Sequence, residues 1–109
     1  MALLAAGVPA DRISFSSDAN ASLPRFDSEG RLIELRCGQI ASLWQECVRA
    51  CALGVSFEVA LGVVTANPAR ALGLAGKGAI AVGQDADLLL IDPNTLAIQR
   101  VMSGGQWRT

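Results

Sequence analysis

The sequence predicts an α/β fold, and three observations support it. Just over half of the 109 residues are hydrophobic but only 5% are aromatic, as in proteins whose strands are covered on both faces. An apolar stripe with helical spacing occupies the middle of the chain. Short strand-like runs separated by Gly, Pro and Asp turns occupy its end. The length suits one small domain or a piece of a larger one.

The first third of the chain predicts a short strand followed by a long loop. Residues 3–8 resemble the end of a helix that closes at Gly7. Residues 12–18, with the sequence RISFSSD, predict a strand. Residues 19–38 are predicted as a polar loop that contains the turn-forming sequence DSEGR. A loop this long inside a compact domain usually has a function.

Helices are predicted in the middle of the chain. The spacing predicts a first helix over residues 39–53, with one apolar stripe and a stop at Gly54; the stripe consists of Ile40, Leu43, Trp44, Cys47, Val48 and Cys51. Ser56 is expected to cap a second helix, with Glu58 in its first turn, where the helix dipole favours a negative charge.

A third helix is predicted in the sequence TANPARALGL. Asn67 is expected as its N-cap, Pro68 as its first helical residue and Gly73 as its end. The pattern then changes to strands over residues 79–82, 87–92 and 98–102, separated by the turns GQDA, DPNT and SGGQ. The composition shift near Gly76 predicts two regions, residues 1–75 and residues 76–109.

Charge and composition argue against several classes of partner. A formal net charge of −1 gives no electrostatic basis for binding nucleic acid or anionic lipid. No apolar run approaches the roughly 18–20 residues of a membrane span, and the start of the chain lacks the basic region of a signal peptide. Three cysteines without a framework pattern predict reduced thiols in a cytoplasmic protein.

Asp18 is the first candidate for a catalytic residue. It stands at the C-terminal end of the predicted strand and opens the long loop, which is where α/β barrels place catalytic groups. Such a carboxylate can bind a metal, take a proton from metal-bound water and return it to a leaving group. The alternative is that Asp18 and Asn20 form an Asx turn in which Ser16 and Ser17 satisfy backbone groups.

Other reactive side chains favour structural roles. Cys47 and Cys51 lie four residues apart on one helical face, but two ligands are too few for a metal site and core packing is favoured. A nucleophilic Cys or Ser needs a base, and the chain has no histidine and only Lys77 as a lysine. Asp85 and Asp87 stand between a glycine turn and an apolar run, which indicates residues at the entry to a strand.

Three segments resemble a known superfamily. The sequence KGAIAVGQDADLLLIDP (77–93) resembles the C-terminal strand segment of the amidohydrolases, which are metal-dependent hydrolases on a (β/α)8, or TIM, barrel. TANPARALGL (65–74) resembles their last barrel helix. The segment 7–32 resembles the isoaspartyl dipeptidases, also called β-aspartyl peptidases, whose Ser-Ser-Asp-Gly-Asn-Gly-Ser run reads SSDANAS here.

The resemblance implies both a fold and site residues. It implies the C-terminal part of the barrel in residues 1–75 and the closing strands of a small β domain in residues 76–109. Asp18 matches the family's zinc ligand and general base, and Ser22 matches its substrate-contacting serine. Asn20 is expected to shape the loop. Ala19 and Ala21 replace glycines, so a positive φ there would strain the backbone.

The resemblance also implies what this chain lacks. The family binds two zinc ions with several histidines and a carboxylated lysine from earlier barrel strands, whereas this chain has no histidine. The chain is therefore expected to be a fragment that does not retain zinc and does not hydrolyse β-aspartyl dipeptides alone. Its uncovered strands predict a homo-oligomer or a swapped assembly.

Two alternatives to the dipeptidase remain open. One keeps the superfamily and changes the substrate, giving an N-acyl-amino-acid deacylase or a dihydroorotase-like hydrolase; the Ser-Ser-Asp-x-Asn-x-Ser run is expected to differ in those families. The other is a non-catalytic, free-standing module that binds a partner through an exposed apolar face.

Overall fold

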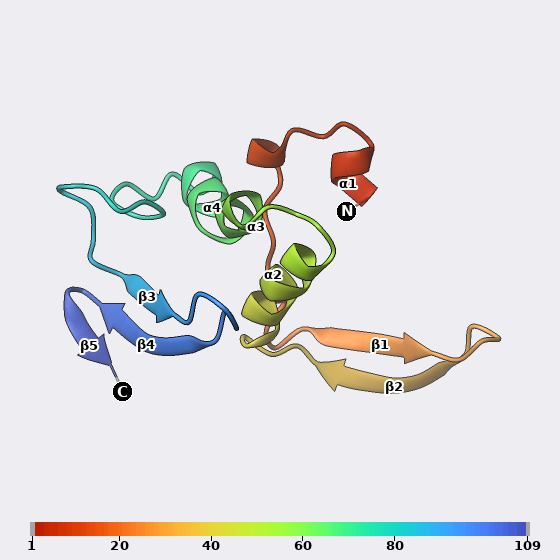
Figure 1. Cartoon of the computed structure of the whole chain (residues 1–109). Coiled ribbons are helices and arrows are strands. Elements are labelled where there is room, and N and C mark those ends of the chain that lie inside the picture. The colour runs from red at the N-terminus through yellow and green to blue at the C-terminus, as the bar shows by residue number, and fades with distance from the viewer. Residues whose placement is uncertain (1, 109) are drawn as a thin grey trace.

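The computed structural model describes residues 2–108, arranged in three regions (Figure 1). Helices lie at the centre, a two-stranded hairpin projects from one side and a three-stranded sheet lies on the other. In chain order the elements are α1 (Ala2–Ala5), the 3-10 helix η1 (Ala10–Arg12), β1 (Ser22–Phe26), β2 (Leu32–Cys37), α2 (Ser42–Ala52), α3 (Phe57–Val64), α4 (Ala66–Ala71), β3 (Leu88–Ile91), β4 (Ile98–Ser103) and β5 (Gln106–Arg108).

The central helices follow their local sequence signals. The Ser56 side chain accepts a hydrogen bond from the backbone N–H of Val59 at 3.3 Å, which confirms the predicted N-cap of α3. Gly54 and Gly73 follow α2 and α4 with φ of 93° and 65°, as the predicted stops require. Apart from Gly38, the buried residues among those described all lie in this region and the segment packed on it: Ile13, Cys47, Ala60, Val63, Asn67 and Ala69.

Asn67 has a different place from the one predicted. It is a buried residue of α4, and Thr65 takes the N-cap position. The Asn67 side chain donates to the backbone oxygens of Ala10 at 2.8 Å and Ile13 at 2.7 Å. The prediction of an N-cap was wrong because the amide satisfies carbonyls of a distant segment instead of the start of its own helix.

The predicted loop over residues 19–38 is largely a β-hairpin, so that prediction was wrong. β1 and β2 pair antiparallel from Ser22↔Cys37 to Phe26↔Leu32, with an irregularity after Arg25. The predicted turn DSEGR does connect them. The Asp27 carboxylate accepts the backbone N–H groups of Glu29 and Arg31, each at 2.9 Å, and Gly30 adopts φ 79°.

Two predicted strands are not formed among the described residues. Residues 13–17 run irregularly, and Phe15 donates one backbone hydrogen bond to Val63 at 3.2 Å. Residues 79–82 also lie outside the helices and strands, with the side chains of Ile80 and Val82 almost fully exposed. Both segments have strand-forming sequences, but a strand needs a neighbour with which to exchange hydrogen bonds.

The C-terminal sheet has the order β3-β4-β5 and confirms two of the predicted strands. Trp44 of α2 donates to the backbone oxygen of Leu96 at 2.9 Å and so joins the helices to the β3–β4 turn. Arg100 stacks on the ring of Trp107 at 4.1 Å from the centroid.

The molecule is extended and exposes a large surface. Its Cα radius of gyration is 16.2 Å, against about 13 Å for a compact domain of this length. Its accessible surface is 8032 Å², against about 5,700 Å² for a compact monomer of the same mass. Within residues 2–108, no helix has the length and hydrophobicity needed to cross a lipid bilayer.

Candidate functional site

The candidate site is a tight turn that carries Asp18. The turn spans residues 18–21 and closes with a hydrogen bond of 2.9 Å from the N–H of Ala21 to the oxygen of Asp18. Asp18 and Asn20 adopt positive φ angles of 46° and 66°, whereas Ala19 and Ala21 do not. Asn and Asp tolerate this region better than other non-glycine residues. The expected strain at the two alanines therefore does not arise.

The serines before Asp18 fix its orientation. The Ser16 hydroxyl donates to the Asp18 carboxylate at 2.7 Å and accepts the Asp18 backbone N–H at 3.0 Å. The Ser17 hydroxyl accepts the N–H of Ala19 at 3.3 Å. These serine–backbone contacts are those of the structural alternative, yet they leave the carboxylate exposed. The turn is thus compatible with a structural role and with a catalytic one.

Gly38 holds this turn against the end of the hairpin. Its N–H donates to Ala21 at 3.0 Å, and its oxygen accepts from Asn20 at 3.1 Å. A Cβ atom at position 38 would lie 2.1 Å from the Asp18 oxygen, so only glycine fits. Sequence reasoning missed this role, because nothing local to Gly38 indicates that it contacts a residue twenty positions earlier.

Ser22 lies directly after the turn as the first residue of β1. It is exposed and faces Cys37 across the hairpin. Asp18 and Ser22 therefore lie at the two ends of one short segment at the base of the projecting hairpin (Figure 1).

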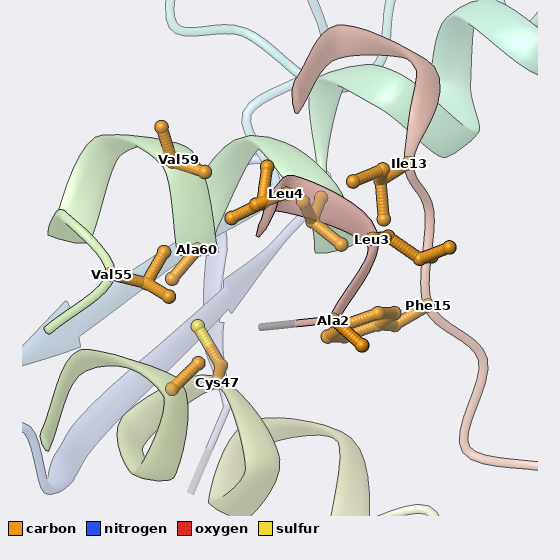
Figure 2. A pocket seen from close by; sticks show the side chains of 11 residues that line it. Ala2, Leu3, Leu4, Ile13, Phe15, Cys47, Val55, Val59 and Ala60 are labelled. Atoms are coloured by element: carbon orange, nitrogen blue, oxygen red, sulfur yellow. The ribbon is translucent and has the colours of Figure 1, made fainter. Parts of the chain in front are cut away.

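An apolar cavity of about 220 Å³ lies between the helices and residues 13–15. Figure 2 shows side chains from α1, α2, α3 and the segment 13–15 facing the same space, among them Phe15, Cys47 and Val59. Burial is the main cause that raises the pKa of the Cys47 thiol, and the neighbouring Cys51 adds to it. Cys47 is therefore a packing residue, as predicted.

A larger groove of about 700 Å³ separates the helices from the C-terminal sheet. Its walls are mostly apolar, and Lys77 lies at it together with Asp85 and Asp87. The Lys77 ammonium lies 2.9 Å from Asp85 and also contacts Asp87, which accepts the N–H of Gly104 at 2.7 Å. These contacts join residues 77–87 to the β4–β5 turn, which supports the structural role predicted for the two aspartates.

The residues present do not fit a metal centre. Among residues 2–108, no three His, Cys, Asp or Glu side chains come together in a way that would hold a metal ion. Asp18 alone offers one carboxylate, which is too little for the zinc pair that the resemblance implies. No chemical step through zinc is therefore assigned to this chain.

The comparison with known proteins establishes the family. Residues 1–108 match the amidohydrolase family, and the chain belongs to it. This family is generally metal-dependent, and its fold mixes helices and strands as this chain does. The described residues do not themselves form a barrel.

Solved structures give a more detailed likeness. A β-aspartyl dipeptidase of Fervidobacterium islandicum AW-1, in complex with a β-Asp-Leu dipeptide, is 35% identical with a TM-score of 0.83 over 97% of this chain. A second structure of β-aspartyl dipeptidase from that organism is 29% identical with a TM-score of 0.77. N-acetylglucosamine-6-phosphate deacetylase of Pasteurella multocida, 21% identical with a TM-score of 0.71, shares the fold.

The chain spans only part of each relative. It covers 28% and 25% of the two dipeptidase chains and 32% of the deacetylase. A dihydroorotase of Halobacterium salinarum is 52% identical, but over only 40 residues, which is 37% of this chain and 10% of that protein. The family is thus shown, and the choice of substrate needs a separate argument.

Proposed function

We propose that this chain is the C-terminal part of a zinc-dependent isoaspartyl dipeptidase, which hydrolyses β-linked aspartyl dipeptides. The observation that carries the proposal is the likeness over 97% of the chain to a β-aspartyl dipeptidase with bound β-Asp-Leu. The run SSDANAS supports it, because this is where the resemblance to that family is most specific. In this proposal residues 1–75 belong to the barrel and residues 76–109 to the small β domain.

Asp18 is the proposed general base. Hydrolysis forms a C–O bond to water and breaks the C–N bond of the β-linked amide. A group must therefore remove a proton from the water and deliver one to the leaving amine. An exposed carboxylate held by the Ser16 hydroxyl at 2.7 Å is suited to both transfers. Asp18 has a left-handed backbone conformation, and Gly38 packs against its backbone oxygen. This conformation directs the Asp18 carboxylate outward from the turn.

Ser22 is the proposed substrate-binding residue. Its hydroxyl lies four residues beyond Asp18, on the first strand of the hairpin. A serine hydroxyl both donates and accepts hydrogen bonds, so it can bind either the amine or a carboxylate of the dipeptide. The proposal assigns it to orientation of the substrate, whereas proton transfer belongs to Asp18.

A dihydroorotase-like function is the second candidate. It is favoured by the 52% identity over 40 residues to the dihydroorotase of H. salinarum. Dihydroorotase acts on a cyclic amide, and the same carboxylate chemistry would serve it. The much longer match to the β-aspartyl dipeptidase makes the dipeptide the preferred substrate.

A chimera tests the proposal. The matching segment of the F. islandicum β-aspartyl dipeptidase is replaced by residues 1–109, and the parent enzyme serves as the control for folding and metal content. We expect the chimera to hydrolyse β-Asp-Leu in preference to α-Asp-Leu and dihydroorotate. A folded, metal-loaded chimera that prefers dihydroorotate would support the second candidate instead. The chain alone, supplied with zinc, is expected to be inactive on all three compounds.

A further inference from the structure

The outer edge of β2 is an unpaired strand edge within the described residues. β1 pairs with one side of β2, and these two strands form a sheet of their own. Every residue of both strands is exposed, and the hairpin projects away from the helices (Figure 1). An isolated hairpin is only marginally stable in water, and an exposed edge is a template for another strand.

The two edges of the hairpin are not equivalent. Backbone bonds from Gly38 to Ala21, at 3.0 Å, and from Asp27 to Arg31, at 2.9 Å, show that odd-numbered residues of β1 bond to β2. The nitrogen of Pro24 therefore faces the outer edge of β1, where it has no proton to donate. By the same alternation, residues 35 and 37 direct their N–H and C=O groups to the outer edge of β2. The β2 edge is the one that can accept a strand.

The two faces of the hairpin also differ. One face carries Ser22, Pro24, Phe26, Leu32, Leu35 and Cys37 and is mostly apolar, and Ile33 is the unpaired residue at the register shift. The other face carries Leu23 and three charged residues: Glu34 lies between Arg36, at 2.9 Å, and Arg25, at 3.7 Å across the strands. An added strand must place apolar residues on the first face and charges of matching sign on the second.

We propose that the occupant of this edge is β2 of a second copy of the chain, paired antiparallel across a two-fold axis. A two-fold axis perpendicular to the sheet places the same face of both hairpins on the same side. Residues opposite each other across the two β2 strands must then belong to the same face, so the axis passes between one residue and the same residue of the second copy. With Glu34 at the axis, the two copies would place Glu34 opposite Glu34. With Leu35 at the axis, Glu34 of each copy faces Arg36 of the other. Charge complementarity selects the second register.

The resulting sheet has the strand order β1-β2-β2-β1. On its charged face each Glu34 lies between its own Arg25 and Arg36 of the second copy. On its apolar face the two Leu35 side chains lie side by side.

Charge reversal tests the register. Glu34→Arg and Arg36→Glu each place like charges opposite each other at two symmetric positions, so each variant alone should dimerise about tenfold or more weakly than wild type. Mixing the two variants makes both cross-strand pairs attractive and should restore a heterodimer.

The double variant Glu34→Arg/Arg36→Glu should dimerise like wild type. Glu29→Arg, on the exposed turn of the hairpin, is the control with the same charge change and should have no effect. Sedimentation equilibrium measures these five samples and the wild type.

A cross-link tests the position of the axis independently of charge. The variant Leu35→Cys/Cys37→Ser places two thiols opposite each other at about 5.5 Å between Cα atoms, which suits a disulfide. It should form a covalent dimer under mild oxidation, whereas Leu23→Cys/Cys37→Ser on β1 should not. A wild-type chain that stays monomeric up to its solubility limit would overturn the proposal. So would single charge reversals that dimerise as tightly as wild type, or equal cross-linking from β1 and β2.

Discussion

The helical region and the β1–β2 hairpin differ in what holds them in place. The helices α2–α4 and the segment 10–15 contain every buried residue of the described chain except Gly38. The hairpin is exposed along its whole length, including apolar side chains such as Phe26, Ile33 and Leu35, which are 55%, 57% and 60% exposed. One region is stabilised by burial, and the other by backbone hydrogen bonds and surface ion pairs.

This difference indicates which parts of the chain are self-sufficient. Burial of apolar side chains and satisfaction of buried polar groups contribute strongly to folding. Exposed ion pairs such as Arg25–Glu34 contribute about 0–1 kcal/mol each. The helical region can therefore order itself, whereas the strands depend on whatever covers them. The candidate site at residues 18–22 lies at the junction of the two regions.

The largest effect on stability is expected at Asn67. Asn67→Ala leaves the buried carbonyl of Ile13 and the partly buried carbonyl of Ala10 without their donor, which should lower the free energy of unfolding by about 1–3 kcal/mol. Urea denaturation followed by circular dichroism at 222 nm, the helix signal, measures it. Asn94→Ala, at an exposed turn, is the matched control. Equal effects of the two substitutions would contradict the assignment of Asn67 as the link between α4 and residues 10–13.

A matched pair of apolar truncations sharpens the comparison. Val63 is 4% exposed and Leu32 is 55% exposed. Val63→Ala should cost about 1–2 kcal/mol of unfolding free energy, through lost burial and a new cavity. Leu32→Ala should cost less than about 0.5 kcal/mol. The same denaturation assay, at a low protein concentration that favours monomer, compares them. A larger loss from Leu32→Ala would show that the hairpin is packed after all.

A smaller effect is expected at the cap of α3. Ser56→Ala removes the acceptor of the Val59 N–H and should cost about 1 kcal/mol. Ser56→Asp keeps an acceptor at the helix start and should retain most of the stability. Thermal unfolding measures the difference in midpoint between these variants. If the two variants melt together, the capping bond does not contribute.

The smallest effect is a local pH dependence in the C-terminal region. The Lys77 ammonium, and next the Gly104 N–H, hold the pKa of Asp87 below its ordinary value of 3.8. Hydrogen bonds to Asp87 and then Asp85 raise the pKa of Lys77 above 10.5. A carboxyl group whose pKa is lowered by folding stabilises the folded state at pH values above its unfolded pKa, and this stabilisation is lost as the pH falls through its folded pKa. A lysine whose pKa is raised by folding stabilises the folded state at pH values below its unfolded pKa, and this stabilisation is lost as the pH rises through its folded pKa.

The β4–β5 turn should therefore loosen below about pH 4 and again above about pH 10.5. The ¹³Cα resonance of Gly104, followed by NMR across the pH range, reports both transitions. In Asp87→Asn the acid transition should disappear from this resonance. Its persistence in the variant would assign the transition to another carboxylate.

Local signals made much of the fold predictable. The Ser56 cap, the stops at Gly54 and Gly73, and the strands near 88–91 and 98–103 follow from residues that act on their immediate neighbours. The Asp18 turn also has a local signal, because Asp and Asn favour turns and tolerate positive φ. These features depend on a few adjacent residues, and the sequence displays them directly.

Long-range contacts set the rest and left no local signal. Asn67 resembles an N-cap by sequence, but its acceptor Ile13 lies 54 positions away. The polar composition of residues 19–38 and the DSEGR turn predict a loop, whereas residues 22–26 and 32–37 pair as a hairpin with every residue exposed. Its one usable signal was the DSEGR turn, flanked by two short apolar runs. Residues 79–82 show the reverse case, a strand-like sequence with no partner strand in the described chain.

Substitution of Asp18 in the dipeptidase chimera tests the central claim most directly. Asp18→Asn keeps the left-handed turn, since asparagine tolerates a φ of 46°, and removes the ability to carry a proton. It should lower kcat for β-Asp-Leu by about 10²–10⁴-fold, whereas Ser22→Ala should chiefly raise KM. A folded Asp18→Asn chimera with unchanged kcat would contradict the assignment of Asp18 as the general base.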